Sequence, residues 1–418
     1  MAGLYLTAAD SGRGAIFAWP RIAAAWRACA STREPVTPAG GRDVRLDLFR
    51  GLALWFIFLN HIPNNVVSWL TVRNFGFSDA TEIFVFISGY TAALVYGKAM
   101  RHEGVVASGA RILKRAWQIY IAHVFLFVMY AAAIVFIATS ADNPQFIARM
   151  GIADFLAQPG FMFIQVLLLR FKPVNMDVLP MYIAVLVAFV PMLWLLLRRP
   201  HLTLLASAAL YALAHAHGWA LTSHSGRPWC FNPLAWQLLF VFGAWCALGG
   251  AARLAGLMRS RAVTAAAVAY LMFAFLIATS WRVPALADAI PAWLAAWMYP
   301  ISKPNLDLLR LVHFLALAML TTRFIGRDHP VLASALVRPL VRCGMHSLEI
   351  FSFGVLLSFV AHAALVQSDG GMAMQVLVSA TGIATLIAAA TLIAWGGRIE
   401  EGEQARAKTL RPVPVVTR

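Results

Sequence analysis

The sequence contains few charged residues for its length. Only 12% of its 418 residues are Asp, Glu, Lys or Arg, and 61% are hydrophobic. A typical soluble domain has about 25% charged and about 45–50% apolar residues. So few charges cannot cover a water-facing surface without leaving large apolar patches. The composition therefore excludes an ordinary soluble protein and indicates that lipid forms part of the solvent.

Cysteine is also scarce, and several sequence signatures are absent. The four cysteines, Cys29, Cys230, Cys246 and Cys343, show no CxxC spacing, so neither a metal site nor a disulfide framework is expected. No GxSxG or Cys/His arrangement marks an acyl-enzyme nucleophile. We find no internal duplication, which weighs against a transporter built from inverted repeats.

Long hydrophobic runs are the main feature that is present. Ten runs approach the roughly 20 residues that a helix needs to cross a bilayer. We therefore predict an all-α polytopic integral membrane protein of about ten transmembrane helices, near residues 48–69, 81–97, 116–138, 178–197, 202–217, 234–250, 263–281, 306–325, 346–366 and 373–396. The segment 139–177 contains FMFIQVLLLRF, which suits either an interfacial or a re-entrant helix.

The basic residues indicate the orientation of the chain. With the N-terminus inside, 25 of the 34 Lys and Arg residues fall in inner segments and seven in outer ones, so both termini should be cytosolic. The net charge of +16 is thus explained by short loops, and no nucleic-acid partner is expected. We predict a cytosolic arm over 1–41, amphipathic or disordered, a transmembrane domain over 42–397 and a disordered cytosolic tail over 398–418.

The first predicted span carries charges that are costly in lipid. Arg50 and His61 are eleven residues apart, which is about 1100° of helical rotation, so they share one face about 16 Å apart. Asp47 can pair with Arg50 one turn earlier. A bundle-facing His with a hydrogen-bonding neighbour is the simple interpretation. We favour a functional role, because a polar group this deep costs several kcal/mol unless it is paired or hydrated.

Two acidic residues open the second span. Glu82 can orient His61 as a carboxylate orients a catalytic imidazole, and Asp79 lies three residues before it. The alternative is that both are solvated acids at the outer surface. The following Ser88-Gly89 pair allows another backbone to approach closely.

A basic segment precedes the third span. Arg111, Lys114 and Arg115 suit a phosphate clamp for a nucleotide-bearing donor, although ordinary positive-inside anchoring explains them equally well. His123, farther along, either lines a path or is a satisfied core residue.

Further polar residues lie near the ends of other spans. Asn64, Asp177, Asn232 and Gln237 are candidate substrate-binding residues. Asp307, Arg310 and His313 recur at i, i+3 and i+6, which suggests either a polar stripe facing a cavity or a structural Asp307–Arg310 pair.

Five ordered blocks resemble the OpgC family: RDVRLDLFRGLALWFIFLNHIPNN, GFSDATEIFVFISGYTAALVYG, KPVNMDVLPMYI, FNPLAWQLLFVFGAW and GMHSLEIFSFGVLLSF. The resemblance covers about residues 42–396. Members of that family are implicated in succinylating osmoregulated periplasmic glucans, so it implies a bacterial inner-membrane acyltransferase.

The OpgC family is similar in turn to membrane-bound acyltransferases of the acyltransferase-3 type. Their Arg/Lys-x10-His pattern is matched here by Arg50 and His61. Their RxxR-like element is matched loosely by Arg111 and Lys114, with Lys at the second position. Their SGF element is matched with Tyr90 in place of Phe.

The resemblance implies transfer of an acyl group, expected to be succinyl, from cytosolic acyl-CoA to hydroxyls of a periplasmic glucan. His61 would be the general base, Arg50 would hold CoA or stabilise the thioester oxygen, and Asp79 or Glu82 would support them. Direct transfer is our default, with acyl-CoA as co-substrate and no permanently bound cofactor. The expected partners are lipid, glucan and acyl-CoA. A transporter of a small anionic metabolite is the main alternative, and a structural or assembly subunit is another.

Overall fold

The computed structural model describes residues 43–409, and this part of the chain is helical, without a β-strand. The predicted arm over 1–41 therefore lies outside the described residues, as do residues 410–418. The elements are α2 (Val44–Asn60), η1 (Val66–Leu70), η2 (Val72–Asn74), α3 (Ala80–Ser140), α4 (Gln145–Arg149), α5 (Ala153–Ala157), α6 (Pro159–Leu167), α7 (Val178–Arg198), α8 (Pro200–His217), α9 (Pro233–Trp245), η3 (Cys246–Gly250), α10 (Ala251–Arg259), α11 (Arg261–Ser280), α12 (Pro284–Asp288), α13 (Ala292–Met298), α14 (Leu308–Phe324), η4 (Pro330–Ala333), α15 (Arg338–Met345), α16 (Ser347–Gln367) and α17 (Met372–Thr409).

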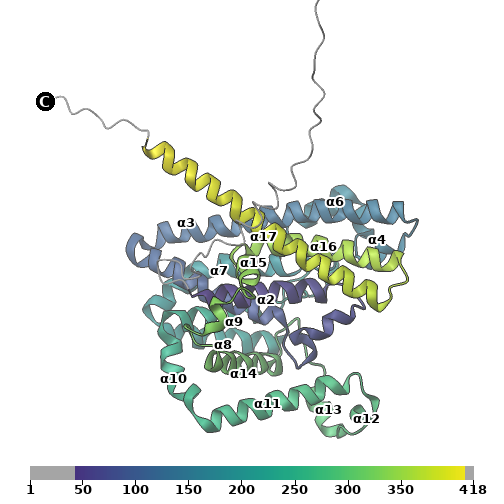
Figure 1. Cartoon of the computed structure of the whole chain (residues 1–418). Helices are drawn as coiled ribbons and strands as arrows, with labels where there is room; N and C mark the ends of the chain where they lie inside the picture. Colours follow the sequence, from purple (N-terminus) through teal and green to yellow (C-terminus); the bar gives the residue numbers. More distant parts are fainter. Residues whose placement is uncertain (1–42, 410–418) are drawn as a thin grey trace, which may run out of the picture. The chain divides into compact units, whose positions relative to one another are not determined.

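Helix α3 consists of two arms that meet at Gly104. This glycine has φ 88° and ψ 172°, a conformation that is essentially closed to residues with a Cβ. Just past the turn, the Ser108 hydroxyl donates to the Tyr96 carbonyl at 3.0 Å, so the second arm folds back on the first. The turn lies on the left of Figure 1. The two arms contain the predicted spans 81–97 and 116–138.

Each of the ten predicted spans coincides with a helix or a helical arm. Six helices are long and apolar enough to cross a membrane by length and hydropathy alone: Ala80–Ser140, Val178–Arg198, Pro233–Arg259, Arg261–Ser280, Ser347–Gln367 and Met372–Ile399. The chain is therefore a helical membrane protein. The number of ten crossings and the cytosolic position of both termini stay predictions.

Two predicted boundaries are wrong. The first span was expected to reach residue 69, but α2 ends at Asn60, because Pro63 and Asn64, with φ 55°, break the helix. At 17 residues, α2 is about 26 Å long. At the other end of the chain, the tail expected to be disordered from residue 398 is helical as far as Thr409, in a stretch rich in Glu, Gln, Ala, Arg and Lys, which favour helix.

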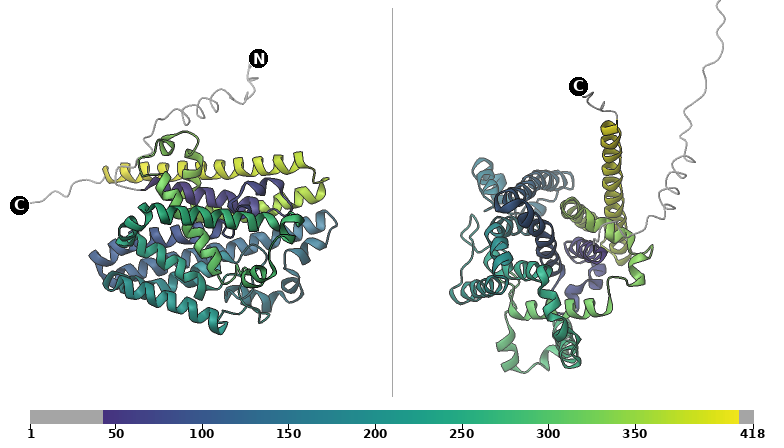
Figure 2. Two further views of the ribbon diagram at one scale, coloured as in Figure 1. Left: turned by 90° about the horizontal axis from the view of Figure 1, so that it is seen from below. Right: turned by 90° about the vertical axis from the view of Figure 1, so that its left-hand side faces the viewer.

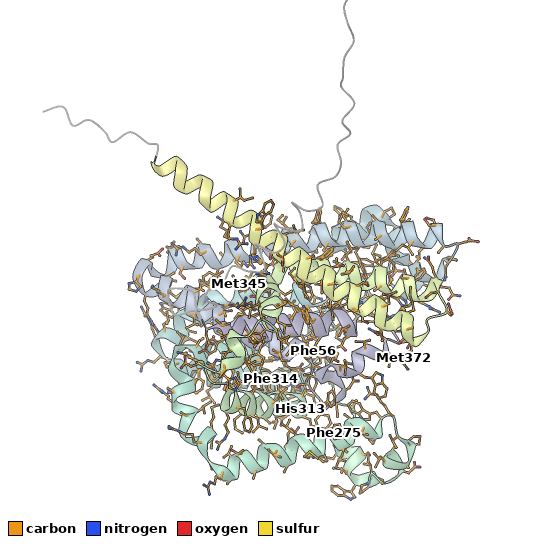
Figure 3. All side chains as sticks on the ribbon, in the orientation of Figure 1. Phe56, Phe275, His313, Phe314, Met345 and Met372 are labelled. Carbon is orange, nitrogen blue, oxygen red and sulfur yellow. The ribbon has the colours of Figure 1, made fainter. Side chains whose placement is uncertain are left out.

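Small residues allow the central helices to pack closely. A Cβ on Gly89 would collide with the Phe240 carbonyl, and one on Gly243 would collide with the Phe86 carbonyl. The first arm of α3 and α9 therefore meet backbone to backbone, which confirms the close approach predicted at Ser88-Gly89. Around this contact aromatic side chains fill the space between helices; Phe314 of α14, for example, has its ring centroid 5.3 Å from that of Phe86 (Figure 3).

The long helices run along a common direction, as both Figure 1 and the left view of Figure 2 show. Helix α17 lies beside α2, where Gly382 contacts the Phe58 ring. Helix α6 follows the second arm of α3, and the Tyr120 hydroxyl donates to the Leu167 carbonyl at 3.0 Å. Tyr120 is near the middle of that arm, so α6 lies alongside the bundle. This position favours the re-entrant interpretation of the segment 139–177.

Candidate active site

The first turn of α3 holds two carboxylates in fixed positions. Asp79 accepts a hydrogen bond from the Thr81 backbone N–H at 2.7 Å, and Glu82 accepts one from the Asp79 N–H at 2.9 Å. This reciprocal arrangement is a capping box. It places both acids at the positive end of the helix dipole, where negative charge is favoured.

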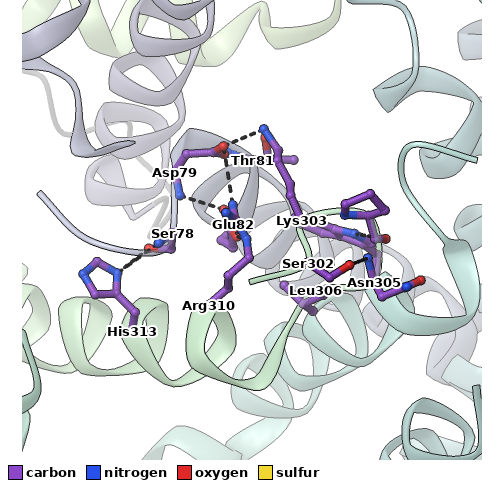
Figure 4. Close-up of polar contacts among 12 residues, drawn as sticks. Ser78, Asp79, Thr81, Glu82, Ser302, Lys303, Asn305, Leu306, Arg310 and His313 are labelled. Atoms are coloured by element: carbon purple, nitrogen blue, oxygen red, sulfur yellow. Dashed lines mark hydrogen bonds and ion pairs between the residues drawn. The ribbon is translucent and has the colours of Figure 1, made fainter. Parts of the chain in front are cut away.

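Two cations from a distant part of the chain complete this cluster (Figure 4). Lys303 Nζ lies 2.5 Å from Asp79 Oδ2, and Arg310 contacts Glu82 Oε1 through Nε at 2.9 Å and Nη2 at 2.7 Å. Arg310 Nη2 is also 3.5 Å from Asp79. Glu82 is fully buried, and Asp79 and Arg310 are only 5% and 8% exposed. We call Asp79, Glu82, Lys303 and Arg310 the ion cluster; its two positive and two negative charges balance.

The cations determine the ionisation of Asp79. Burial alone would raise the pKa of its carboxyl group, but Lys303 and Arg310 outweigh burial and hold the pKa below its usual range. Asp79 is therefore a carboxylate at neutral pH. The alternative that Asp79 and Glu82 are solvated surface acids is wrong.

His313 lies one turn after Arg310 on α14, next to the ion cluster. Its Nδ1 lies 2.7 Å from the Ser78 hydroxyl and accepts from the Ser78 backbone N–H at 3.3 Å. The ring packs directly on Gly76, where a Cβ would collide with it. Arg310 and His313 thus both face the start of α3, as Figure 4 shows, which agrees with the predicted polar stripe.

The predicted Asp307–Arg310 pair does not form. Asp307 is the N-cap of α14 and accepts from the Leu309 N–H at 2.9 Å. A short carboxylate at the N-cap satisfies a backbone donor that would otherwise lack a partner. Arg310 is then left to neutralise Glu82, a buried acid on another helix.

His61 lies at the end of α2, at the edge of the ion cluster. Its backbone N–H donates to Ile57 O at 3.0 Å and Phe58 O at 3.2 Å, so the residue ends the helix. Its Nδ1 is buried and has no hydrogen-bond partner among residues 43–409. The charges of Lys303 and Asp79 act on the imidazole. The predicted orientation of His61 by Glu82 is wrong, because both Glu82 oxygens are engaged by Arg310 and the Asp79 N–H.

Arg50 lies near the middle of α2. Its Nη2 donates to the Thr91 hydroxyl at 2.8 Å, and its Nη1 is 3.9 Å from Asp47. The predicted pairing of Asp47 with Arg50 is thereby confirmed. The eleven residues to His61 correspond to about 16 Å along the helix, so the two groups cannot contact one small reacting centre.

The predicted phosphate-binding residues lie after the Gly104 turn, on the second arm of α3. Arg111 and Lys114 are exposed and Arg115 is half-buried. Arg111 is 2.5 Å from Glu103, and Arg115 donates to Gln118 at 3.3 Å. Both contacts are on the surface, so these cations are accessible to a ligand. They lie far along the chain from the ion cluster.

Two of the four predicted substrate-binding residues have structural roles. Asn232 caps α9 through the Leu234 N–H at 3.2 Å, and its amide donates to Asn305 at 3.2 Å. Gln237 accepts from the Ser207 hydroxyl at 2.6 Å and is buried. Asn232 thereby supports the loop that carries Lys303, whereas Gln237 joins α9 to α8.

The other two substrate-binding candidates lie in loops. Asn64 is exposed in the turn after His61. Asp177 precedes α7, and burial raises the pKa of its carboxyl group, with Lys172 opposing that shift. Lys303 acts electrostatically on both Asp177 and His61.

Lys303 is the main residue that sequence reasoning missed. It lies 224 residues from Asp79 in a proline-containing loop and counted only as an outer basic residue. The one sequence feature that distinguishes Lys303 is that the predicted outer segments contain few cations. Ser78 and Gly76 were also missed, although both lie just before Asp79, the N-cap of α3.

Comparison with known protein families gives a match over most of the chain. The family model described as OpgC protein matches residues 42–398. No curated protein and no solved structure matches the chain.

Proposed function

The chain belongs to the OpgC family, whose model matches most of its length, and from this premise we propose that it moves a succinyl group from cytosolic acyl-CoA to hydroxyls of a periplasmic glucan. Family membership implies a membrane-bound acyltransferase that modifies glucans. The acyl-CoA donor, the succinyl group and the bacterial inner-membrane location are the finer parts of the proposal. The similarity to acyltransferase-3 enzymes adds support.

One observation carries the proposal: a histidine with an unbonded buried nitrogen lies beside a rigid ion cluster. His61 Nδ1 has no partner within the described part of the chain, so the imidazole is available for proton transfer. A positioned imidazole contributes about 10²- to 10⁴-fold to such reactions. The four charges of the ion cluster neutralise each other, so they can be retained in a low-dielectric site.

In the proposed step, His61 takes the proton from a glucan hydroxyl as its oxygen attacks the thioester carbonyl carbon. The carbon–sulfur bond then breaks, and the CoA sulfur receives the proton from the imidazolium. The products are a glucan ester and free CoA. No acyl-enzyme forms, because the glucan oxygen attacks the donor directly.

Lys303 is the cation best placed to stabilise the oxyanion of this step. Its charge acts on His61, and its side chain is 41% exposed, so a reactant can reach it. Asp79 holds the ammonium group in place at 2.5 Å. Arg50, about 16 Å away along α2, instead suits binding of the CoA portion, and Arg111, Lys114 and Arg115 suit its phosphates.

The proposal is tested with purified full-length protein in lipid vesicles, supplied with radiolabelled succinyl-CoA and glucan. We expect base-labile label on the glucan and release of free CoA, with acetyl-CoA a poorer donor. Succinyl label that crosses the vesicle membrane without joining the glucan would overturn the proposal and identify a transporter. The family match gives that alternative no support.

A further inference from the structure

A cavity opens next to the loop that carries Lys303. Its volume is about 300 Å³, and its wall includes Tyr270, Trp297, Tyr299, Asp307 and Val312. These residues come from α11, α13, α14 and the loop between α13 and α14; Figure 1 shows α11 and α13 along the bottom, with α14 above α11. The volume is at the lower end of the roughly 300–1,000 Å³ of small-molecule sites.

The lining combines aromatic rings with two polar groups that remain available to a ligand. Trp281 Nε1 donates to the Tyr299 hydroxyl at 2.6 Å, so the Tyr299 oxygen acts as acceptor there and keeps its own proton to donate. Asp307 uses Oδ1 for the Leu309 N–H, and a carboxylate has further acceptor sites. The cavity therefore offers one hydroxyl donor, carboxylate acceptors and aromatic faces.

The charge of the lining restricts the ligand. Asp307 is the sole ionisable acid or base in the cavity wall apart from tyrosine, and a carboxylate repels phosphates and carboxylates. Anionic ligands such as the donor CoA and a free dicarboxylate are therefore unsuitable occupants. A neutral sugar ring fits, because its hydroxyls pair with Asp307 and Tyr299 while its C–H faces meet the negative faces of aromatic rings.

The wall of the cavity is linked to the candidate active site through the loop 299–307 and the first turn of α14. The Asp307 N–H donates to Ser302 O at 2.9 Å, Lys303 follows Ser302 and contacts Asp79, and Arg310 lies one turn beyond Asp307. The Tyr270 hydroxyl donates to Leu309 O at 2.8 Å. A sugar bound in the cavity would therefore lie next to the surface that leads to Lys303 and His61.

We propose that this cavity, lined by Trp297, Tyr299 and Asp307, binds a glucose unit of the acceptor glucan next to the unit that is acylated. The inference rests on the proposed function for the identity of the sugar. Trp297 supplies a stacking face, and Asp307 and Tyr299 hold hydroxyls.

Helix α13 provides a matched pair of variants. Trp297 lines the cavity and Trp293 does not, yet both are largely exposed, at 69% and 72%, one turn apart on the same helix. If both rings serve only as anchors at the membrane interface, Trp297→Ala and Trp293→Ala behave alike. A third variant, Asp307→Asn, keeps an oxygen for the Leu309 N–H and so keeps the cap.

The test is binding of short β-linked glucose oligosaccharides to the full-length protein in lipid nanodiscs, without acyl donor. We expect Trp297→Ala to raise Kd about tenfold and Asp307→Asn to raise it several-fold, while Trp293→Ala changes it less than about twofold. No binding to the unaltered protein, or equal losses for both tryptophan variants, overturns the inference. Because no donor is present, failed acyl transfer with intact, Trp297-dependent binding would count against the proposed function alone.

Discussion

The start of α3 and the region just after its Gly104 turn hold charged residues in opposite ways. At its start, the ion cluster holds three buried charges and the partly exposed Lys303, whose ammonium group contacts Asp79 across 224 residues of sequence. After the Gly104 turn, Arg111, Lys114 and Arg115 lie at or near the surface, and Arg111 and Arg115 contact residues no more than eight positions away. A buried charge must be neutralised by other residues of the folded protein. A charge at the surface is stabilised by water and stays available to bind a ligand. The first arrangement therefore suits a preorganised reaction centre and the second a binding surface for a polyanion.

The largest effect on this comparison is expected from replacing Arg310. Arg310→Met leaves Glu82 buried without its cation, which should destabilise the protein by about 3–5 kcal/mol. The melting temperature in detergent and the amount of protein in the membrane should both fall. Arg323→Ala is the control on the same helix, because Arg323 is exposed and donates to Met258 O. Equal melting temperatures for the two variants would show that the ion cluster does not stabilise the fold.

Replacing Lys303 tests the chemistry assigned to the ion cluster. Lys303→Met should lower acyl transfer by about 10²-fold, the typical cost of losing one oxyanion donor, with little change in the amount of protein. Arg282→Met is a control for a second outer cation, because Arg282 contacts Asn74 and the Trp69 ring instead. Full activity of the Lys303 variant would contradict the role given to its ammonium group.

The same variant makes a pH-dependent prediction. The pKa of Asp79 in the folded state is lowered, so its pairing stabilises the protein above the unfolded value near 3.8 and is lost as the pH falls toward the folded value. Without Lys303 the folded pKa of Asp79 rises. Acid unfolding of Lys303→Met, followed by circular dichroism, should therefore begin at a higher pH. If the variant unfolds at the same pH as the unaltered protein, Lys303 does not lower the pKa of Asp79.

A smaller effect is expected at the turn between the two ends of α3. Gly104→Ala places a Cβ at φ 88°, where nothing lies within 4 Å, so the cost is backbone strain alone, about 1–3 kcal/mol. Gly256→Ala in α10 also meets no neighbour but has ordinary helical geometry, and it should be neutral or stabilising. The measurement is the melting temperature of each variant. Similar melting temperatures for Gly104→Ala and Gly256→Ala would mean that a side chain does not strain the turn.

The smallest effect belongs to the exposed basic residues. Arg111→Gln combined with Lys114→Gln should weaken binding of acyl-CoA several-fold, with the difference shrinking at high salt because exposed charges are screened. Stability should change by less than about 0.5 kcal/mol. Titration calorimetry at two ionic strengths provides the measurement. Unchanged affinity at low salt would place the donor phosphates elsewhere.

The helices were largely predictable, because each apolar run has its own signal. The errors occurred where local chemistry ends a helix: Pro63 and Asn64 stop α2 earlier than hydropathy alone indicates. Beyond Arg398 the chain stays helical because helix-favouring residues continue past the last apolar run.

The site was predictable only where partners are close in sequence. Asp47 and Arg50 follow the i, i+3 rule, and Asp79 with Glu82 has the i, i+3 spacing of the capping box that the structure shows. The same i, i+3 rule paired Arg310 wrongly with Asp307, because helix capping and a buried acid on another helix took precedence. Nothing local marks Lys303, whose role comes entirely from the tertiary fold.

The most direct test of the central claim is the rate of acyl transfer by His61→Gln in purified protein. Glutamine preserves much of the size and hydrogen bonding of the side chain but cannot accept and release a proton at neutral pH. We predict a loss of about 10²- to 10⁴-fold in the rate, with unchanged melting temperature and unchanged affinity for acyl-CoA. Transfer at the unaltered rate would contradict the account of His61 as the base.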